Sequence, residues 1–337
     1  MIANLVNRCV VLSARPKGVP KAEHFTVDEI AVPDLGLGEF LVKTEFWSVD
    51  PAMRGWANDA PNYLPPVQIG AAMRSFAVGE VVASRHSDYR EGEIVSGLFG
   101  WQRYAISDGS DVDRKVGDAD LPSSLALGIL GLNGITAYFG LLDVCQPRAG
   151  DNVVVSTAAG AVGSAVGQIA KIKGMRTVGI TSSAAKARLC VEQFGYDAMI
   201  NYRNQDVAAA LKETCPDGVD CYFDNTCGWI SDAVMANLAR GARITICGTA
   251  ALTDWTPIPE GPRVNRQLLV ARARMQGFLV LDYKDRYPEA LAELTDWVRE
   301  GKLAYNEHVL EGAAAAPDAI NMLYEGRNEG KLLVRVD

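Results

Sequence analysis

Short apolar runs separated by Gly, Pro and Asp dominate the first 120 residues of the chain. These runs lie at Cys9–Leu12, Phe40–Phe46, Ala77–Ala83 and Ile94–Leu98, with turn-like segments at 36–40 and 88–93. Compact or alternating apolar runs of this length, bounded by turn residues, are typical of β-strands. The pattern therefore predicts a small antiparallel β-barrel or β-sandwich.

From about residue 121 longer helical patterns alternate with compact apolar strands. The expected strands are Asn152–Ser156, Thr177–Ile180, Asp197–Asn201, Asp220–Asn225 and Ala242–Gly248. The expected helices are Gly163–Lys173, Ala185–Phe194, Val207–Thr214 and Ser231–Leu238. Such alternation predicts βαβ units and a parallel sheet. With right-handed crossovers, these units form a doubly wound α/β domain.

The C-terminal part continues this alternation after a loop rich in Thr and Pro at Thr249–Arg263. We expect a strand at Met275–Leu281 and a helix at Tyr287–Glu300. The segments Glu307–Leu310 and Lys331–Val336 again have the pattern of strands.

Composition and charge narrow the class of protein. The chain is 48% hydrophobic and 22% charged, which is typical of a soluble globular protein. Its length of 337 residues suggests two domains or one large domain. The formal net charge of −8, without a block of Lys or Arg, disfavours a nucleic-acid partner. The most apolar region, Leu125–Leu142, is interrupted by glycines and predicts a buried helix pair rather than a membrane span. Since the N-terminus lacks a signal-peptide layout, we expect a cytosolic protein without membrane attachment.

The spacings of cysteine and histidine along the sequence do not match those of metal-binding motifs. None of the seven cysteines forms a C-x-x-C pair, and we expect free thiols. The three histidines, His24, His86 and His308, lie far apart in the sequence. We therefore expect no bound metal.

A dinucleotide-binding pattern follows the strand Asn152–Ser156. The segment from Ala158 to Gly163 has the G-x-G-x-x-G spacing, with Ala158 in place of the first glycine, and it opens a helix. Gly160 would let the backbone approach a pyrophosphate, and Gly163 would let the helix pack close to the strand. The helix N-terminus supplies N–H groups and a positive dipole end for phosphates. Small-residue turns also occur for packing alone, but the surrounding βαβ pattern favours nucleotide binding.

The end of the next strand favours NADP over NAD. NAD sites usually carry an acidic residue about 20 residues after the fingerprint. Here Thr181, Ser182 and Ser183 follow the strand, and Lys186 comes three residues later. Hydroxyl groups and a cation suit a 2′-phosphate, although Lys186 as an ordinary solvated lysine is the alternative.

Several longer motifs resemble one family of reductases. In chain order they are SVDPAMRGW, LALGILGLNGITAYFGLLDVCQPRAGDNVVVSTAAGAVGSAVGQIAKIKG, YFDNTCG, MQGFLVLDY and GRNEGK, and they extend along nearly the whole chain. Together they resemble the zinc-free branch of the medium-chain dehydrogenases/reductases that includes prostaglandin, curcumin and plant 2-alkenal reductases. The zinc-dependent relatives carry a ligand cysteine near the position of Val49 and a Gly-His-Glu motif, and this chain has neither.

The resemblance implies a split architecture and a set of NADPH contacts. A GroES-like domain would hold residues 1–122 with 302–337, and a Rossmann domain would hold residues 123–301. Pyrophosphate contacts would come from Gly160, Ala161, Val162 and Gly163, and 2′-phosphate contacts from Ser183, Lys186 and Tyr202. Further contacts along the cofactor would come from Asn225, Cys247, Gly248, Phe278, Leu279, Val280 and Asn328. The family also implies a homodimer.

The resemblance further implies hydride transfer from NADPH to the β-carbon of an α,β-unsaturated aldehyde or ketone. Donors must then stabilise the negative charge that develops on the carbonyl oxygen. This chain has Thr253 and Ala52 where the family usually has substrate-side tyrosines, so its pocket is altered. Tyr63 is the leading candidate to replace these tyrosines as hydrogen-bond donor to the carbonyl oxygen. An equal alternative is that its ring only packs beside Pro65 and Pro66. Arg54 and Tyr283 are weaker candidates for substrate contacts.

Two other functions stay open at this point. Related folds reduce quinones with the same cofactor geometry, so a quinone reductase is one alternative. A non-catalytic NADPH-binding protein is the other, because the two tyrosine positions are lost. A zinc alcohol dehydrogenase is disfavoured because its ligands are absent from the sequence.

Overall fold

The computed structural model describes residues 5–60, 62–252, 257 and 259–336. The chain divides into two compact units. One unit runs to Leu127 and takes up the chain again at Glu307, and the other spans Gly128–Asn306. The sequence placed these boundaries after residues 122 and 301, a few residues earlier in each case.

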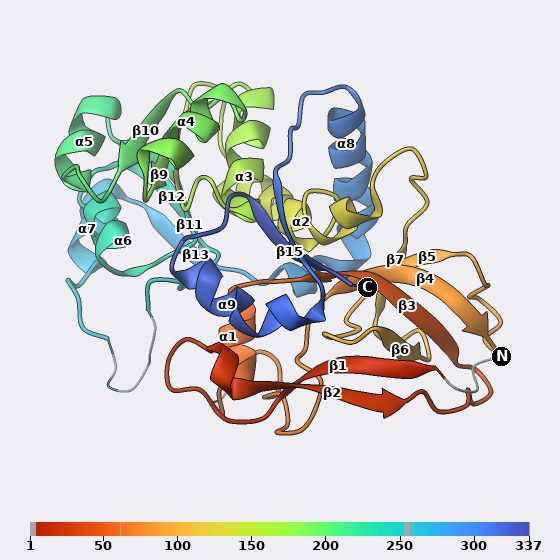
Figure 1. The fold of residues 1–337 in the computed structure, drawn as a ribbon. Helices are drawn as coiled ribbons and strands as arrows, with labels where there is room; N and C mark the ends of the chain where they lie inside the picture. The colour runs from red at the N-terminus through yellow and green to blue at the C-terminus, as the bar shows by residue number, and fades with distance from the viewer. Residues whose placement is uncertain (1–4, 61, 253–256, 258, 337) are drawn as a thin grey trace. The chain divides into compact units, whose positions relative to one another are not determined.

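The first unit is built mainly on antiparallel strands, and only β14 and β15 pair in parallel among the described residues. A seven-stranded sheet has the order β14-β15-β3-β4-β5-β7, with β6 paired to β3 (Figure 1). A separate pair joins β1 and β2. The strand bounds are β1 Val6–Leu12, β2 Phe25–Ala31, β3 Phe40–Ser48, β4 Ala77–Ser84, β5 Ile94–Gly97, β6 Tyr104–Ser107, β7 Val112–Lys115, β14 Glu307–Glu311 and β15 Lys331–Arg335. Two helices complete the unit, α1 Ala52–Ala57 and α9 Ala316–Tyr324.

A large apolar core stabilises this unit, beside a smaller cluster that contains Phe46, Val78 and Leu333. Its largest fully buried side chains include Phe40, Trp47, Met53 and Trp101. Burying each of these side chains contributes about 1.5–3 kcal/mol or more. Helix α9 closes the core with Ala316, Ala319 and Ile320, and this helix was missed from the sequence.

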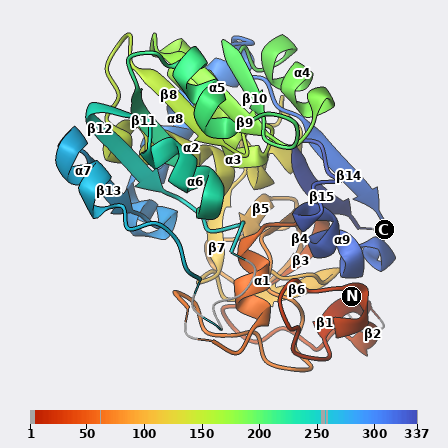
Figure 2. The ribbon, with the colours of Figure 1, turned by 90° about the vertical axis from the view of Figure 1, so that its left-hand side faces the viewer.

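The second unit contains a six-stranded parallel sheet in the order β10-β9-β8-β11-β12-β13. The strands are β8 Asn152–Ser156, β9 Arg176–Thr181, β10 Ala198–Asn201, β11 Val219–Asp224, β12 Leu238–Ile246 and β13 Arg274–Gly277. The helices are α2 Leu132–Phe139, α3 Ala161–Ile172, α4 Ala184–Glu192, α5 Val207–Thr214, α6 Gly228–Met235, α7 Asn265–Ala271 and α8 Tyr287–Arg299. They cover both faces of the sheet (Figures 1 and 2). The order is that of a doubly wound Rossmann domain, so the predicted fold class is confirmed.

The central strands are apolar on both sides because helices cover both faces. In β8, Val153, Val154 and Val155 are completely buried. Helix α3 approaches the sheet on a line of small residues. A Cβ atom on Gly167 would lie 2.2 Å from the ring of Tyr196, so only glycine permits this packing.

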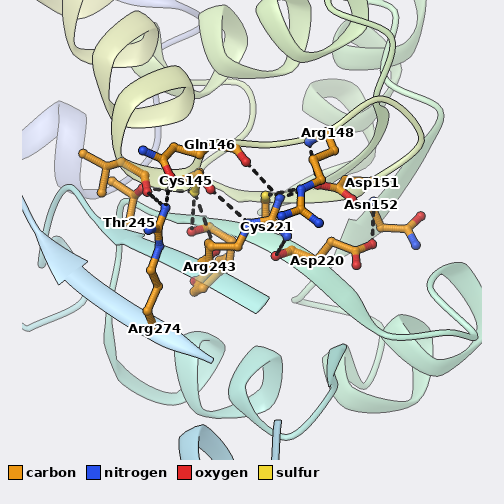
Figure 3. Close-up of polar contacts among 12 residues, drawn as sticks. Cys145, Gln146, Arg148, Asp151, Asn152, Asp220, Cys221, Arg243, Thr245 and Arg274 are labelled. Carbon is orange, nitrogen blue, oxygen red and sulfur yellow. Dashed lines mark hydrogen bonds and ion pairs between the residues drawn. The ribbon is translucent and has the colours of Figure 1, made fainter. Parts of the chain in front are cut away.

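A polar network holds the loop that enters β8 (Figure 3). The Arg243 guanidinium donates to the carbonyl oxygens of Cys145 and Gln146, at 3.1 and 3.0 Å, and forms an ion pair with Asp151. Arg274 Nη2 donates to Gln146 Oε1 at 2.7 Å. Since Asp151 directly precedes β8, this network lies at the amino end of that strand. The carboxyl ends of the strands carry the features described next.

Several element boundaries differ from the sequence prediction, most clearly those of α6, β12 and β13. Helix α6 begins at Gly228, three residues before the predicted start at Ser231, because the preceding loop turns directly into the helix. Strand β12 begins at Leu238, where a helix was expected to end. Strand β13 ends at Gly277, and Val280–Arg286 forms a 3-10 turn instead of continuing the predicted strand. The pairing of β13 with β12 ends at the same residue, so no partner extends the strand.

Candidate functional site

The fingerprint turn joins β8 to α3 at the carboxyl edge of the parallel sheet. Thr157 adopts a φ of 55°, which a non-glycine residue rarely does, and Gly160 occupies the N-cap position of α3. A Cβ atom on Gly163 would lie 2.2 Å from the Thr157 carbonyl oxygen. Glycine at this position therefore allows the helix to start directly against the turn.

The first turn of α3 is suited to bind a phosphate. Gly160 has no side chain that could accept from the first N–H groups, including those of Ala161, Val162 and Gly163. The first N–H groups of a helix have no partner within it, and the helix dipole favours negative charge there. The residues thus fit the pyrophosphate of a dinucleotide.

The segment after β9 carries Ser183 and Lys186 into the start of α4. Ser183 caps helix α4, because its Oγ accepts from the Lys186 backbone N–H at 3.2 Å. The Tyr202 backbone N–H donates to the Thr181 carbonyl oxygen at 3.0 Å, which brings the end of β10 beside this segment. The three residues predicted for a 2′-phosphate therefore lie on segments that follow two adjacent strands, β9 and β10.

Asn225 links the end of β11 to the end of β8. Its side-chain Nδ2 donates to the Ser156 carbonyl oxygen, and its backbone N–H donates to Ser156 Oγ, both at 2.8 Å. The backbone N–H groups of Cys247 and Gly248 both donate to the Asp224 carbonyl oxygen, at 2.8 and 3.1 Å. The structure thus brings three predicted cofactor residues to the edge where the fingerprint turn lies.

Sequence reasoning missed Asp224, which organises this loop. Its side chain is fully buried. Its Oδ1 accepts from the Tyr222 hydroxyl at 2.9 Å and from the backbone N–H groups of Thr226 and Cys227 at 2.9 and 2.8 Å. Burial, together with the charge of Asp224, raises the pKa of the Cys247 thiol to about 12. Cys247 is therefore a neutral thiol near pH 7 and does not act as a thiolate.

The segment after β13 packs on the helical layer of the same unit. The Phe278 backbone N–H donates to the Ile246 carbonyl oxygen at 3.3 Å. Tyr283 stacks on Phe139 with ring centroids 4.7 Å apart, and its ring also meets Phe278 edge-on at 5.9 Å. The ring of Tyr283, a weaker candidate for substrate contact, is thus part of an aromatic cluster. Leu279 and Val280 lie beside this cluster in the chain.

The substrate-side candidates of the first unit lie around α1. Ala52 is the first residue of that helix. The buried Arg54 guanidinium lies 4.9 Å from the ring centre of Tyr324, whose hydroxyl donates to the Pro51 carbonyl oxygen at 2.9 Å. Tyr63 is 44% exposed and meets the buried ring of Trp56 at 6.5 Å. Tyr63 is therefore only partly buried by this packing.

Tyr324 was not predicted, because the helix that carries it was missed from the sequence. Burial raises the pKa of Tyr324, and the nearby Arg54 charge opposes that shift only in part. Asn328 is also buried, and its Nδ2 donates to the Gly330 carbonyl oxygen at 2.8 Å. Thr253, the other substrate-side candidate, lies outside the described residues.

The fold and this strand-end turn define a dinucleotide-binding oxidoreductase with a second, β-rich domain. Residues 8–114 match the family model described as the N-terminal domain of oxidoreductase. Residues 161–296 match the model described as zinc-binding dehydrogenase.

Individual relatives cover nearly the whole chain. It is 42% identical over 335 residues to the NADPH-dependent curcumin reductase of Escherichia coli, covering 98% of this chain and 97% of the relative. It is 36% identical to the NADP(+)-dependent 2-alkenal reductase of Nicotiana tabacum, covering 100% and 99%. The crystal structure of CurA from Vibrio vulnificus in complex with NADPH superposes with a TM-score of 0.92 at 42% identity, covering 98% and 99%. The chain therefore belongs to the medium-chain dehydrogenase/reductase family, in the branch of the curcumin and 2-alkenal reductases, and the resemblance seen in the sequence is confirmed.

Within the described part of the chain, no three His, Cys, Asp or Glu side chains gather closely enough to hold a metal ion. No helix among the same residues is both long and apolar enough to cross a membrane.

Proposed function

We propose that this protein is an NADPH-dependent reductase of the carbon–carbon double bond in α,β-unsaturated aldehydes or ketones. The fingerprint turn supports the proposal most strongly, because Gly163 lets α3 begin directly against Thr157 and the N-cap Gly160 leaves the first N–H groups of the helix for a phosphate. The family relationship supports NADP dependence, since relatives of this chain are named as NADPH-dependent and NADP(+)-dependent reductases.

The cofactor contacts proposed are those at the strand ends. Gly160–Gly163 would hold the pyrophosphate, and Ser183, Lys186 and Tyr202 would hold the 2′-phosphate. Further contacts would come from Asn225, Cys247, Gly248, Phe278, Leu279, Val280 and Asn328. The absence of a carboxylate between Thr181 and Lys186 supports the phosphorylated cofactor, because no negative charge opposes the 2′-phosphate there.

The chemistry requires orientation and charge stabilisation rather than a nucleophile. When bound, NADPH supplies the hydride that reduces the β-carbon. The substrate carbonyl oxygen then gains negative charge and needs a hydrogen-bond donor. The phenol of the partly buried Tyr63 is our candidate donor, and Ala52, Arg54, Thr253 and Tyr283 are proposed to shape the substrate's surroundings. A proton added at the α-carbon completes the reduction.

NADPH oxidation, followed by absorbance with a small substrate panel, tests this proposal. The panel contains a 2-alkenal, a bulky aromatic enone and a quinone, each repeated with NADH. We expect turnover of an enone or enal with NADPH and little with NADH. Turnover of the quinone alone would replace the proposal with a quinone reductase. NADPH binding without turnover of any panel member would indicate a non-catalytic binding protein.

We also propose that the protein is a cytosolic homodimer. All seven cysteines are free thiols, which is the state that a reducing compartment maintains. Strand β13 forms one edge of the parallel sheet and its residues are exposed, so it offers unpaired backbone groups to a second copy. Sedimentation equilibrium checks this assembly, and a monomer across the concentration range would contradict it.

A further inference from the structure

Trp229 exposes a large indole at the start of α6, just after the carboxyl end of β11. It lies in the first turn of α6 and is 54% exposed, whereas Trp47, Trp56, Trp101 and Trp297 are 0–8% exposed. An indole left in water forgoes the favourable burial that makes tryptophan a strong packing and binding residue. Its exposure leaves a large aromatic face available for stacking by a ligand.

The indole pairs with Tyr202 across the strand ends. The two ring centroids lie 5.7 Å apart, with the rings at 81° to each other. Tyr202 follows β10 and Trp229 follows β11, and β9 and β8 lie between these strands in the sheet. The aromatic pair thus spans the two strands whose ends carry the proposed phosphate contacts.

Both phosphate positions flank this pair. On one side, the backbone of Tyr202 is bonded to Thr181, and Ser183 and Lys186 follow directly. On the other side, the loop between β11 and α6 precedes Trp229. Asn225 in this loop is hydrogen-bonded to Ser156, the last residue of β8 before the fingerprint turn. In NADPH the adenosine joins the 2′-phosphate to the pyrophosphate. A cofactor that uses both positions would place its adenosine beside this pair.

The loop before Trp229 is held in a strained conformation. Cys227 has a φ of 57° and a ψ of −161°, a region that is essentially restricted to glycine. Its backbone N–H is held by the buried Asp224 carboxylate at 2.8 Å. Strain of this kind concentrates at ligand clamps and persists only where the surroundings impose it. In this protein the strained conformation of Cys227 determines where α6 begins and therefore where the Trp229 indole lies.

We propose that Trp229 and Tyr202 form the aromatic wall of an adenosine subsite, in which the adenine ring stacks on the indole. The inference rests on the proposed NADPH dependence and adds a specific base contact to it. Adenine is planar and apolar on its faces, so it can cover the indole without demanding a particular hydrogen-bond partner. From the free energy that base–aromatic stacking contributes per base, we expect loss of the indole to weaken adenosine binding roughly 5- to 150-fold.

Calorimetric titrations of 5′-AMP, 2′,5′-ADP and NADPH test the subsite without any reaction. We expect Trp229→Ala to weaken all three by a similar factor and Trp229→Phe to retain most of the affinity. Lys186→Ala should instead weaken only the two ligands that carry a 2′-phosphate. Leu269→Ala is the matched control, because Leu269 is another exposed apolar side chain of the same unit, at 77% exposure. It should change none of the three affinities.

Tryptophan emission gives a second readout. We expect 2′,5′-ADP to quench the emission of the unaltered protein and to quench Trp229→Phe much less, because the remaining tryptophans are not stacked by the ligand. Unchanged affinity of a folded Trp229→Ala variant for 5′-AMP and 2′,5′-ADP would overturn the subsite and leave the cofactor proposal standing. Failure of the unaltered protein to bind any of the three ligands would overturn both.

Discussion

Lys331 Nζ lies 2.6 Å from Asp50 Oδ1, although 281 positions separate the two residues in the chain. The lysine is 4% exposed, and its ammonium also donates to Ser48 Oγ at 2.6 Å and to the Val49 carbonyl oxygen at 3.2 Å. The pair joins β15, near the C-terminus, to the turn that enters α1. It therefore stabilises the segment that carries Ala52 and Arg54.

Removing one partner of this buried pair should destabilise the first unit. We expect Lys331→Met to lower the free energy of unfolding by about 3–5 kcal/mol, because Asp50 would keep a poorly solvated charge. The matched control is Lys302→Met, since Lys302 pairs with Glu300 on the surface and should contribute less than about 1 kcal/mol. Urea denaturation measures both. Equal losses in the two variants would show that the Lys331 pair has no special contribution.

Lys186 should discriminate between the two nicotinamide cofactors. We expect Lys186→Ala to weaken NADPH binding by about 1.5–3 kcal/mol, because a charge-assisted phosphate contact is lost. NADH binding should hardly change. Arg188→Ala, an exposed position on the same helix, serves as the control. Fluorescence titration with both cofactors gives the affinities, and equal losses for NADPH and NADH would refute the 2′-phosphate contact.

Tyr63 should contribute to catalysis through its hydroxyl group. We expect Tyr63→Phe to lower kcat for an enone by about 10²–10³-fold, the usual effect of removing one oxyanion donor. Tyr324→Phe is the control, because that hydroxyl already donates to the Pro51 carbonyl oxygen. Steady-state kinetics separate the two variants. An unchanged kcat in Tyr63→Phe would favour the alternative that the ring only packs beside the prolines.

The folded protein should be more stable with glycine in place of Cys227. Its φ of 57° and ψ of −161° are strained for a side chain, and relief of such strain is worth about 1–3 kcal/mol. The greater freedom of glycine in the unfolded chain offsets about 0.5–1 kcal/mol of this gain. We therefore expect Cys227→Gly to raise Tm, and Cys227→Ala to leave it nearly unchanged, because alanine keeps the Cβ atom. A lower Tm for the glycine variant would contradict the strain.

Glu307 should make stability depend on pH. Burial raises the pKa of Glu307, while the Ser124 hydroxyl, which donates to Oε2 at 2.8 Å, and the Lys331 charge act in the opposite direction. A carboxyl group whose pKa is raised on folding is unfavourable when charged, so it destabilises the fold above its folded pKa. That destabilisation disappears as the pH falls through the folded pKa and the group takes up a proton.

Glu307→Gln removes the charge and should therefore be more stable than the unaltered protein near neutral pH. The difference should shrink as the pH falls toward about 4, the ordinary range of a carboxyl group. Thermal unfolding across this pH range measures it. Glu311→Gln, on the exposed end of the same strand, is the control. A Tm difference that stays constant or grows on acidification would contradict the assignment.

The sequence by itself determined the fold class and the position of the fingerprint turn between β8 and α3. Val153–Val155 form a continuous apolar run before Gly160 and Gly163, and this local order is sufficient to predict a buried parallel strand that opens into a helix. The residues from Thr181 to Lys186 follow the next strand directly, so their proximity to the turn could also be inferred. These features depend on spacings of a few residues within one βαβ unit.

Only the tertiary structure decided which distant residues meet. The contact of Tyr202 with Trp229 depends on the sheet order, because two other strands lie between the strands that carry them. The pairing of Lys331 with Asp50 depends on the return of β15 to β3. A local pattern records whether a segment is a strand or a helix, and it does not record the segment's neighbours, because those contacts form through packing between elements far apart in the chain.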